Sequence, residues 1–168
     1  MILIGFMGAG KTTVGRLLGK RLGLTFLDLD AAICADAQKT IPELFSERGE
    51  AGFRLLEFET LRKHVGSPLV LSTGGGCVET EAVRSLLKGR ANVVYLASSF
   101  DHLYERITRD VSVVRPIVSA KSRQELEALY QSRLALYDEV ADVRLDTDGL
   151  TAWQVAEQLQ LLSRQQLS

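Results

Sequence analysis

The sequence lacks the features that would place the protein in a membrane, on nucleic acid or in a disulfide-rich fold. Its 168 residues include only two cysteines, Cys34 and Cys77, without CxxC spacing or a nearby histidine pair, so neither a disulfide nor a zinc site is expected. The net charge of −1 leaves no basic excess for nucleic acid. No apolar run approaches the roughly 20 residues of a membrane span, and no signal peptide is visible. We therefore expect a cytoplasmic protein without nucleic-acid or membrane partners.

One segment, Gly5–Thr12, matches the P-loop pattern G-x-x-x-x-G-K-[ST]. Its glycines let consecutive backbone N–H groups point at a phosphate chain, and the helix that follows adds the positive end of its dipole. Lys11 is expected on the β- and γ-phosphates, and the Thr12 hydroxyl on Mg²⁺. A glycine-rich turn that binds nothing is the alternative, but the predicted strand before the loop and the helix after it favour nucleotide binding.

Strands and helices alternate along the chain. The predicted strands are 2–4, 25–27, 69–73, 92–97 and 143–145. The predicted helices are 14–22, 40–49, 50–64, 80–87, one that begins after 98 or 99, 126–137 and 151–159. This order is typical of an α/β fold with a parallel sheet. We predict one domain over residues 1–168, with Trp153, Val155, Ala156 and Leu159 of the last helix packed on its core.

Two carboxylates follow the second predicted strand. Asp28 and Asp30 stand two residues apart, so in an extended strand both side chains would lie on the same face. Ligands of open α/β sheets bind at the carboxyl ends of strands, where one acid could serve Mg²⁺ and its waters and the other a substrate hydroxyl. A helix N-cap on a solvated turn is the alternative for Asp28.

Two arginines and a glycine run are further candidates for a ligand site. Arg54 and Glu57 face each other on a predicted helix, and this spacing alone favours a surface ion pair. Arg133 lies on the apolar stripe of another helix, so it needs a partner from the protein or a ligand. Gly74, Gly75 and Gly76 follow the third predicted strand and would let backbone approach a ligand closely.

The segment 109–121 has no clear period and carries Arg115-Pro116 at its centre. It is the best candidate for a mobile lid over the phosphates, with an ordinary surface loop as the alternative.

Six blocks, in order along nearly the whole chain, resemble shikimate kinases. They are G-F-M-G-A-G-K-T-T-V-G-R, D-L-D, G-E-A-G-F-R-L-L-E, T-G-G-G, R-P-I-V and R-L-A-L-Y-D-E-V-A-D. The resemblance implies a P-loop kinase of three α/β/α layers with a five-stranded parallel sheet and a mobile lid at about residues 110–121. It also implies ATP-dependent phosphorylation of a shikimate hydroxyl to shikimate 3-phosphate, with Mg²⁺ and as a monomer. The lid has Arg-Pro-Ile-Val where the family more often has Arg-Pro-Leu-Leu.

The resemblance assigns the nucleotide end of the site. Nucleotide binding falls on Gly8, Ala9, Gly10, Lys11, Thr12, Thr13, Arg109 and Arg115. Thr12 and Asp28 are implied as metal ligands, Asp28 through water, and Ser72 lies where a hydroxyl stands near the magnesium shell. Arg115 is implied to reach the transferring phosphate, whereas Arg106 and Arg109 are both candidates to stack on adenine.

The resemblance also assigns the acceptor end. Substrate binding falls on Asp30, Arg54, Gly75, Gly76 and Arg133, and catalysis on Lys11, Asp30 and Arg115. Arg54 and Arg133 are implied to grip the substrate carboxylate, and this makes a ligand-binding arginine the better interpretation of the Arg54–Glu57 spacing. Whether Asp30 takes the hydroxyl proton stays open.

Other acceptors are the main alternative at this stage. A related P-loop kinase acting on gluconate or on a nucleoside monophosphate would share the nucleotide motif, and a regulatory nucleotide-binding protein would as well. The absence of N-K-x-D disfavours a GTPase switch. Only four residues precede Gly5, which leaves open whether the natural chain starts upstream or belongs to a larger polypeptide.

Overall fold

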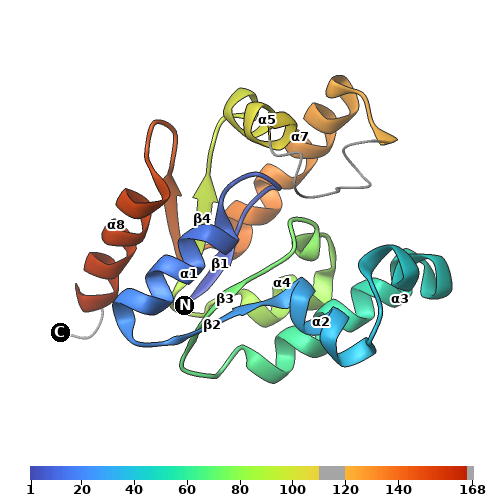
Figure 1. The fold of residues 1–168 in the computed structure, drawn as a ribbon, viewed down its shortest axis with the longest axis horizontal. Coiled ribbons are helices and arrows are strands. Elements are labelled where there is room, and N and C mark those ends of the chain that lie inside the picture. Colours follow the sequence, from blue (N-terminus) through green and yellow to red (C-terminus); the bar gives the residue numbers. More distant parts are fainter. Residues whose placement is uncertain (110–119, 166–168) are drawn as a thin grey trace.

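A computed structural model describes residues 1–109 and 120–165. In this part of the chain a five-stranded parallel sheet lies between helices (Figure 1). The strands are β1 (Ile2–Ile4), β2 (Thr25–Asp28), β3 (Leu69–Ser72), β4 (Val93–Ala97) and β5 (Val143–Asp146), in the order β2-β3-β1-β4-β5. The helices are α1 (Lys11–Leu22), α2 (Leu29–Ala37), α3 (Ile41–His64), α4 (Glu81–Leu87), α5 (Phe100–Arg109), α7 (Arg123–Val140) and α8 (Ala152–Gln165), with the short 3₁₀ helix η1 (Cys77–Glu79).

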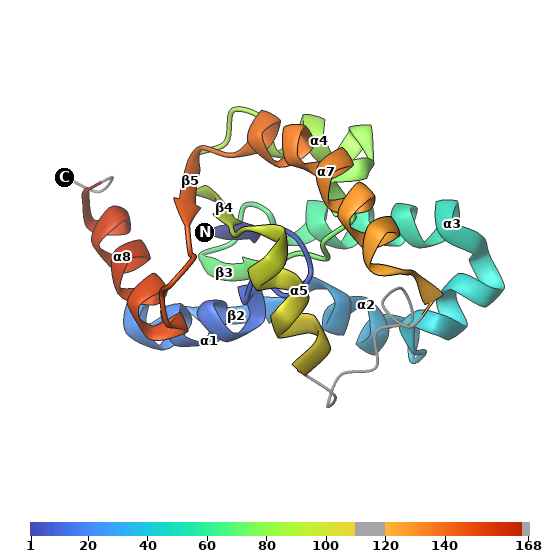
Figure 2. The ribbon, with the colours of Figure 1, turned by 90° about the horizontal axis from the view of Figure 1, so that it is seen from above.

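The helices cover both faces of the sheet. Helices α1 and α8 pack against each other on one face, and α4 and α7 lie on the other (Figure 2). The middle strand β1 pairs with β3 on one side and β4 on the other, and Leu3 and Ile4 are fully buried. A strand covered on both faces needs apolar residues at every position, which explains the unbroken Ile-Leu-Ile run. The predicted three-layer α/β/α arrangement with a five-stranded parallel sheet is therefore confirmed.

Parallel pairing brings the carboxyl ends of β1, β2 and β3 to one edge of the sheet. In register, Ser72 at the end of β3 lies opposite Asp28 of β2 and opposite Leu3 of β1. The loop Gly5–Gly10, the connection from β2 into α2 and the glycines after β3 all leave the sheet there (Figure 1). This edge is where ligands of open α/β sheets bind.

The segment after β2 differs from the prediction. Strand β2 ends at Asp28, and the chain enters α2 at once, so Asp30 lies in the first turn of a helix that the sequence did not indicate. The expectation that Asp28 and Asp30 share a strand face is wrong, because Asp28 is the N-cap of α2 and accepts a hydrogen bond from the backbone N–H of Ala31.

Two further predictions concern helices. The break predicted near Gly49 is present, since Gly49 has φ 67° and ψ 179° inside α3 and separates its two halves. Trp153 was expected on the core, but it is 53% exposed and its ring lies 4.1 Å from the Arg21 guanidinium carbon. The buried stripe of α8 is made by Val155, Ala156 and Leu159, and Trp153 lies outside it on the helical wheel. None of the helices in residues 1–109 and 120–165 is both long and apolar enough to cross a membrane.

Gly19 of α1 supports the tight connection into β2. A Cβ atom there would lie 2.9 Å from the backbone oxygen of Leu24 and 3.4 Å from Cβ of Phe26. Gly19→Ala should lower the free energy of unfolding by about 1–3 kcal/mol, because the backbone must shift to admit the methyl group. The matched control is Gly66→Ala, where a Cβ would meet nothing within 4 Å. Urea denaturation measures both variants, and an equal effect of the two would contradict the packing argument.

Candidate active site

The P-loop forms the first wall of the site. It joins β1 to α1, with Gly8 and Gly10 at φ 81° and 86°, a region that favours glycine, and α1 begins at Lys11. Ala9 is buried beneath the loop, whereas Thr12 and Thr13 are exposed on the first turn of the helix. The loop therefore directs a helix N-terminus toward the carboxyl edge of the sheet, as an anion site requires.

Lys11 is folded back on its own loop. Its Nζ donates hydrogen bonds to the backbone oxygens of Gly5 at 2.7 Å and Phe6 at 3.0 Å, and the residue is only 9% exposed. Burial lowers the pKa of Lys11 to about 8, against the opposing influence of nearby acidic groups that include Asp28 and Asp30. The ammonium group is thus held at the loop by neutral carbonyl groups, which an anionic ligand could replace with a stronger interaction.

Thr12 and Asp28 form an oxygen-only pair beside the loop. The Thr12 hydroxyl donates a hydrogen bond to Oδ2 of Asp28 at 2.8 Å, while Oδ1 of Asp28 caps α2. Mg²⁺ prefers one or two protein oxygens and completes its shell with water and phosphate, so this pair fits Mg²⁺. Ser72 lies opposite Asp28 in the sheet register and is 2% exposed. Among the described residues, no three His, Cys, Asp or Glu side chains cluster to form a cage for a metal.

Asp30 carries a buried oxygen atom that lacks a partner. Within the described part of the chain, Oδ1 of Asp30 is inaccessible to solvent and accepts no hydrogen bond. Burial raises the pKa of Asp30, Asp28 raises it further, and Lys11 and Arg54 oppose the shift. A buried acceptor left unsatisfied costs free energy, so this atom fits a ligand that brings a hydroxyl donor.

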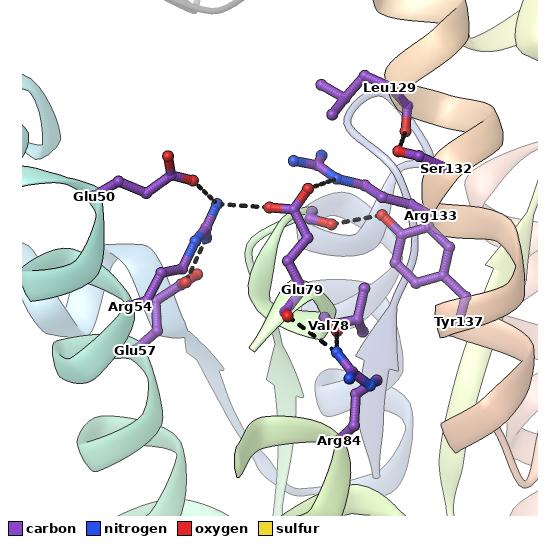
Figure 3. A network of polar contacts seen from close by, with 11 residues as sticks. Glu50, Arg54, Glu57, Val78, Glu79, Arg84, Leu129, Ser132, Arg133 and Tyr137 are labelled. Carbon is purple, nitrogen blue, oxygen red and sulfur yellow. Dashed lines mark hydrogen bonds and ion pairs between the residues drawn. The ribbon is translucent and has the colours of Figure 1, made fainter. Parts of the chain in front are cut away.

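Arg54 is surrounded by carboxylates. It donates to Glu57 at 2.5 Å and to Glu79 at 3.1 Å, with a longer contact to Glu50 at 3.5 Å (Figure 3). Glu57 is 1% exposed, and burial raises its pKa to about 7 although Arg54 favours its charged form. The interpretation as a surface ion pair is therefore wrong, because Glu57 is buried and orients the guanidinium from below.

Arg133 is the partner of Arg54 across the site. It is 3% exposed in α7, its Nε donates to Glu79 at 3.0 Å, and its guanidinium carbon lies 5.6 Å from the Phe6 ring. Figure 3 shows the carboxylate of Glu79 between the two guanidinium groups, one from α3 and one from α7. The partner that Arg133 needs on the apolar stripe of α7 is thus Glu79, which the sequence did not reveal. A single glutamate in a 3₁₀ helix of three residues carries no periodic signal that could have revealed it.

Gly76, the last residue of the glycine run, lies close to both arginines. A Cβ atom on Gly76 would lie 3.0 Å from Nη2 of Arg133 and nearer still to Nη2 of Arg54, so a side chain at this position would displace the guanidinium groups. The Tyr137 hydroxyl donates a hydrogen bond to the backbone oxygen of Gly75 at 2.5 Å, and burial raises the pKa of Tyr137, which keeps this donor protonated. The run is therefore held in place close to both arginines.

The arginines of α5 lie on the other side of the P-loop. Nη1 of Arg106 approaches the backbone oxygen of Gly8 at 3.5 Å, whereas Arg109 is 77% exposed and pairs with Glu105 at 2.6 Å. The structure thus brings Arg106 to the loop and leaves Arg109 at the surface. Arg115 and positions 110–119 of the predicted lid lie outside the described residues.

Comparisons with known proteins agree with this arrangement. The family model described as shikimate kinase matches residues 7–163. A shikimate kinase from Enterococcus faecalis is 39% identical over 159 residues, which cover 95% of each chain. The structure of a shikimate kinase from Acinetobacter baumannii in complex with shikimate is 38% identical with a TM-score of 0.85, covering 99% of this chain and 94% of that one.

A kinase for a different acceptor is more distant. The structure of a gluconokinase from Sinorhizobium meliloti has a TM-score of 0.59 at 17% identity, which indicates a shared fold alone. The family model and the identities above 30% over almost the full length give one answer: the chain belongs to the shikimate kinase family.

Proposed function

We propose that this protein transfers the γ-phosphoryl group of ATP to a hydroxyl group of shikimate, giving shikimate 3-phosphate. The observation that carries the proposal is the pair Arg54 and Arg133, which face each other across Gly76 and share one carboxylate. Two guanidinium groups at one point suit a small carboxylic acid, since each charge-assisted hydrogen bond is worth roughly 1.5–3 kcal/mol. Membership in the shikimate kinase family supports this acceptor over gluconate.

The nucleotide end of the reaction uses the P-loop. Backbone N–H groups of residues 8–13 would bind the phosphate oxygens, and Lys11 would exchange its carbonyl partners for them. Thr12 and Asp28 would hold Mg²⁺, which when bound neutralises negative charge on the β- and γ-phosphates. We assign the adenine contact to Arg109, because its exposed side chain can turn onto a base while Arg106 is held at Gly8.

The acceptor end aligns the attacking hydroxyl. Arg54 and Arg133 would hold the carboxylate and the backbone of Gly75 and Gly76 would contact the ring, so the hydroxyl comes to Oδ1 of Asp30. That oxygen accepts a hydrogen bond from the hydroxyl and can take its proton as the new O–P bond forms. Phosphoryl transfer depends mainly on such alignment and on charge neutralisation.

Several parts of the proposal come from the sequence and the family resemblance alone. Arg115 would reach the transferring phosphate from a lid at about residues 110–121. A single kinase domain over residues 1–168, a monomeric state and a cytoplasmic location also stay predictions.

Acceptor choice is the direct test. A coupled assay with ATP should give turnover with shikimate and little with gluconate, a nucleoside monophosphate or shikimate methyl ester, because the last lacks the charge. Arg133→Ala and Arg133→Lys should both raise the KM for shikimate at least about tenfold, since a decade corresponds to about 1.4 kcal/mol and an ammonium group lacks the bidentate fork. The KM for ATP should change far less.

The matched control is Arg123→Lys, at the exposed first residue of the same helix. It should leave the KM for shikimate unchanged, and Arg133→Ala should hardly alter turnover of the ester. Equal phosphorylation of acid and ester by the wild type would refute the carboxylate clamp.

Lys11→Met tests the phosphate site. Turnover should fall by about 10²–10³, because a donor aimed at the developing charge is lost while the apolar stem is kept. Lys20→Met, on the exposed side of α1, should leave turnover unchanged, and the urea midpoints of both variants report on folding. Activity of Lys11→Met within a few-fold of the wild type would rule out this role.

The two aspartates should respond differently to magnesium. Asp28→Asn keeps an oxygen for the α2 cap but weakens the metal site, so excess Mg²⁺ should restore part of its activity. Asp30→Asn should lower kcat by about 10²–10⁴ at every Mg²⁺ concentration, because it removes the proton acceptor. Titrations of Mg²⁺ against initial rate distinguish the roles, and the assignment is wrong should the two variants behave alike.

A further inference from the structure

Glu79 occupies the point where the two arginines meet. Its Oε2 accepts from Arg54 at 3.1 Å and its Oε1 accepts from Arg133 at 3.0 Å, so each carboxylate oxygen serves one guanidinium group (Figure 3). A ligand carboxylate bound by both arginines would need the same position, with one oxygen at each guanidinium group. This position holds one carboxylate, and a second negative charge there would be repelled.

The backbone of Glu79 is fixed although its side chain is not enclosed. Its N–H donates to the backbone oxygen of Gly76 at 3.0 Å. Its own carbonyl oxygen and that of Val78 accept from Nη1 of Arg84, at 3.0 and 2.8 Å. The side chain is 31% exposed, so it can turn toward solvent by side-chain rotation while η1 stays in place.

We propose that Glu79 is a resident carboxylate that occupies the clamp until the acceptor carboxylate displaces it, and that it thereby sets the acceptor KM. This inference rests on the proposed function, in which Arg54 and Arg133 bind that carboxylate. Arg133 is 3% exposed, and a buried guanidinium without a counter-charge is costly, so Glu79 keeps the clamp satisfied between turnovers.

Displacement also gives selectivity. Each guanidinium group of the clamp already has a close carboxylate, Glu57 or Glu79, so a simple anion finds no unpaired positive charge there. A ligand that adds contacts at Asp30 and at Gly75 and Gly76 can offset the loss of the Glu79 contacts. A ligand that offers a carboxylate alone cannot.

Removal of the Glu79 charge tests the inference. Glu79→Gln and Glu79→Ala should lower the KM for shikimate at least about threefold, because the apparent affinity of a partly occupied site is reduced in proportion to the fraction of sites that are free. The kcat and the KM for ATP should stay within twofold of the wild type. Acetate, as a bare carboxylate, should inhibit both variants several-fold more strongly than the wild type. Acetate should also raise the melting temperature of both variants more than that of the wild type.

The matched control is Glu50→Gln. Glu50 contacts Arg54 at 3.5 Å, forms no hydrogen bond or ion pair with Arg133 in the described part of the chain and is 67% exposed. It should leave the KM for shikimate and the acetate inhibition within twofold of the wild type.

Two results would overturn the inference. A higher KM for shikimate in Glu79→Gln would mean that Glu79 orients the arginines and stays in place, and an unchanged KM in both Glu79 variants would mean that it does not compete. If the wild type fails to phosphorylate shikimate, the proposed function is wrong. The acetate-dependent melting temperatures still report whether Glu79 fills the clamp.

Discussion

The site depends on the parallel pairing of β3 between β2 and β1. Parallel strands direct all their carboxyl ends to one edge, so three loops that are far apart in the sequence leave the sheet as neighbours. The P-loop, the Asp28–Asp30 corner and the glycine run then form three sides of one site. Strands β1, β3 and β4 are almost fully buried, and the packing of α1 against β1, β2 and β3 stabilises this edge.

The second constraint is charge compensation: a buried charged group of the site needs a polar partner. Lys11, Glu57 and Arg133 are each at most 9% exposed, and each has a polar partner in the protein: carbonyl oxygens for Lys11, Arg54 for Glu57 and Glu79 for Arg133. The partners of Lys11 and Arg133 are oxygen acceptors that a ligand can replace, since phosphate and carboxylate oxygens bind the same donors. Oδ1 of Asp30 is the exception, a buried acceptor without a partner in the described residues.

Local signals in the sequence predicted most elements well. The break at Gly49 lies where it was expected, and the structure has capping boxes at Thr40 and Ser122 at the starts of α3 and α7. Where local reasoning failed, the pattern was compatible with two structures. Asp28-Leu29-Asp30 can alternate in a strand or cap a helix, and the cap prevails because Asp28 satisfies both Ala31 and Thr12. Trp153 is apolar, yet its position on α8 and the stacked Arg21 keep it at the surface.

The sequence by itself determined the fold class and the P-loop motif, because motif spacing and hydrophobic periodicity are local properties of the chain. The roles proposed for the arginines came from the resemblance to shikimate kinases, since spacing alone favoured a surface ion pair for Arg54. The sequence also showed that Arg133 needed a partner. Only the tertiary structure decided which one, since Glu79 is 54 residues away and reaches Arg133 through the packing of η1 against α7. The burial of Lys11 and Glu57, the unpaired oxygen of Asp30 and the different surroundings of Arg106 and Arg109 likewise depend on long-range packing. Such packing sets solvent exposure and electrostatic environment, and no local pattern encodes it.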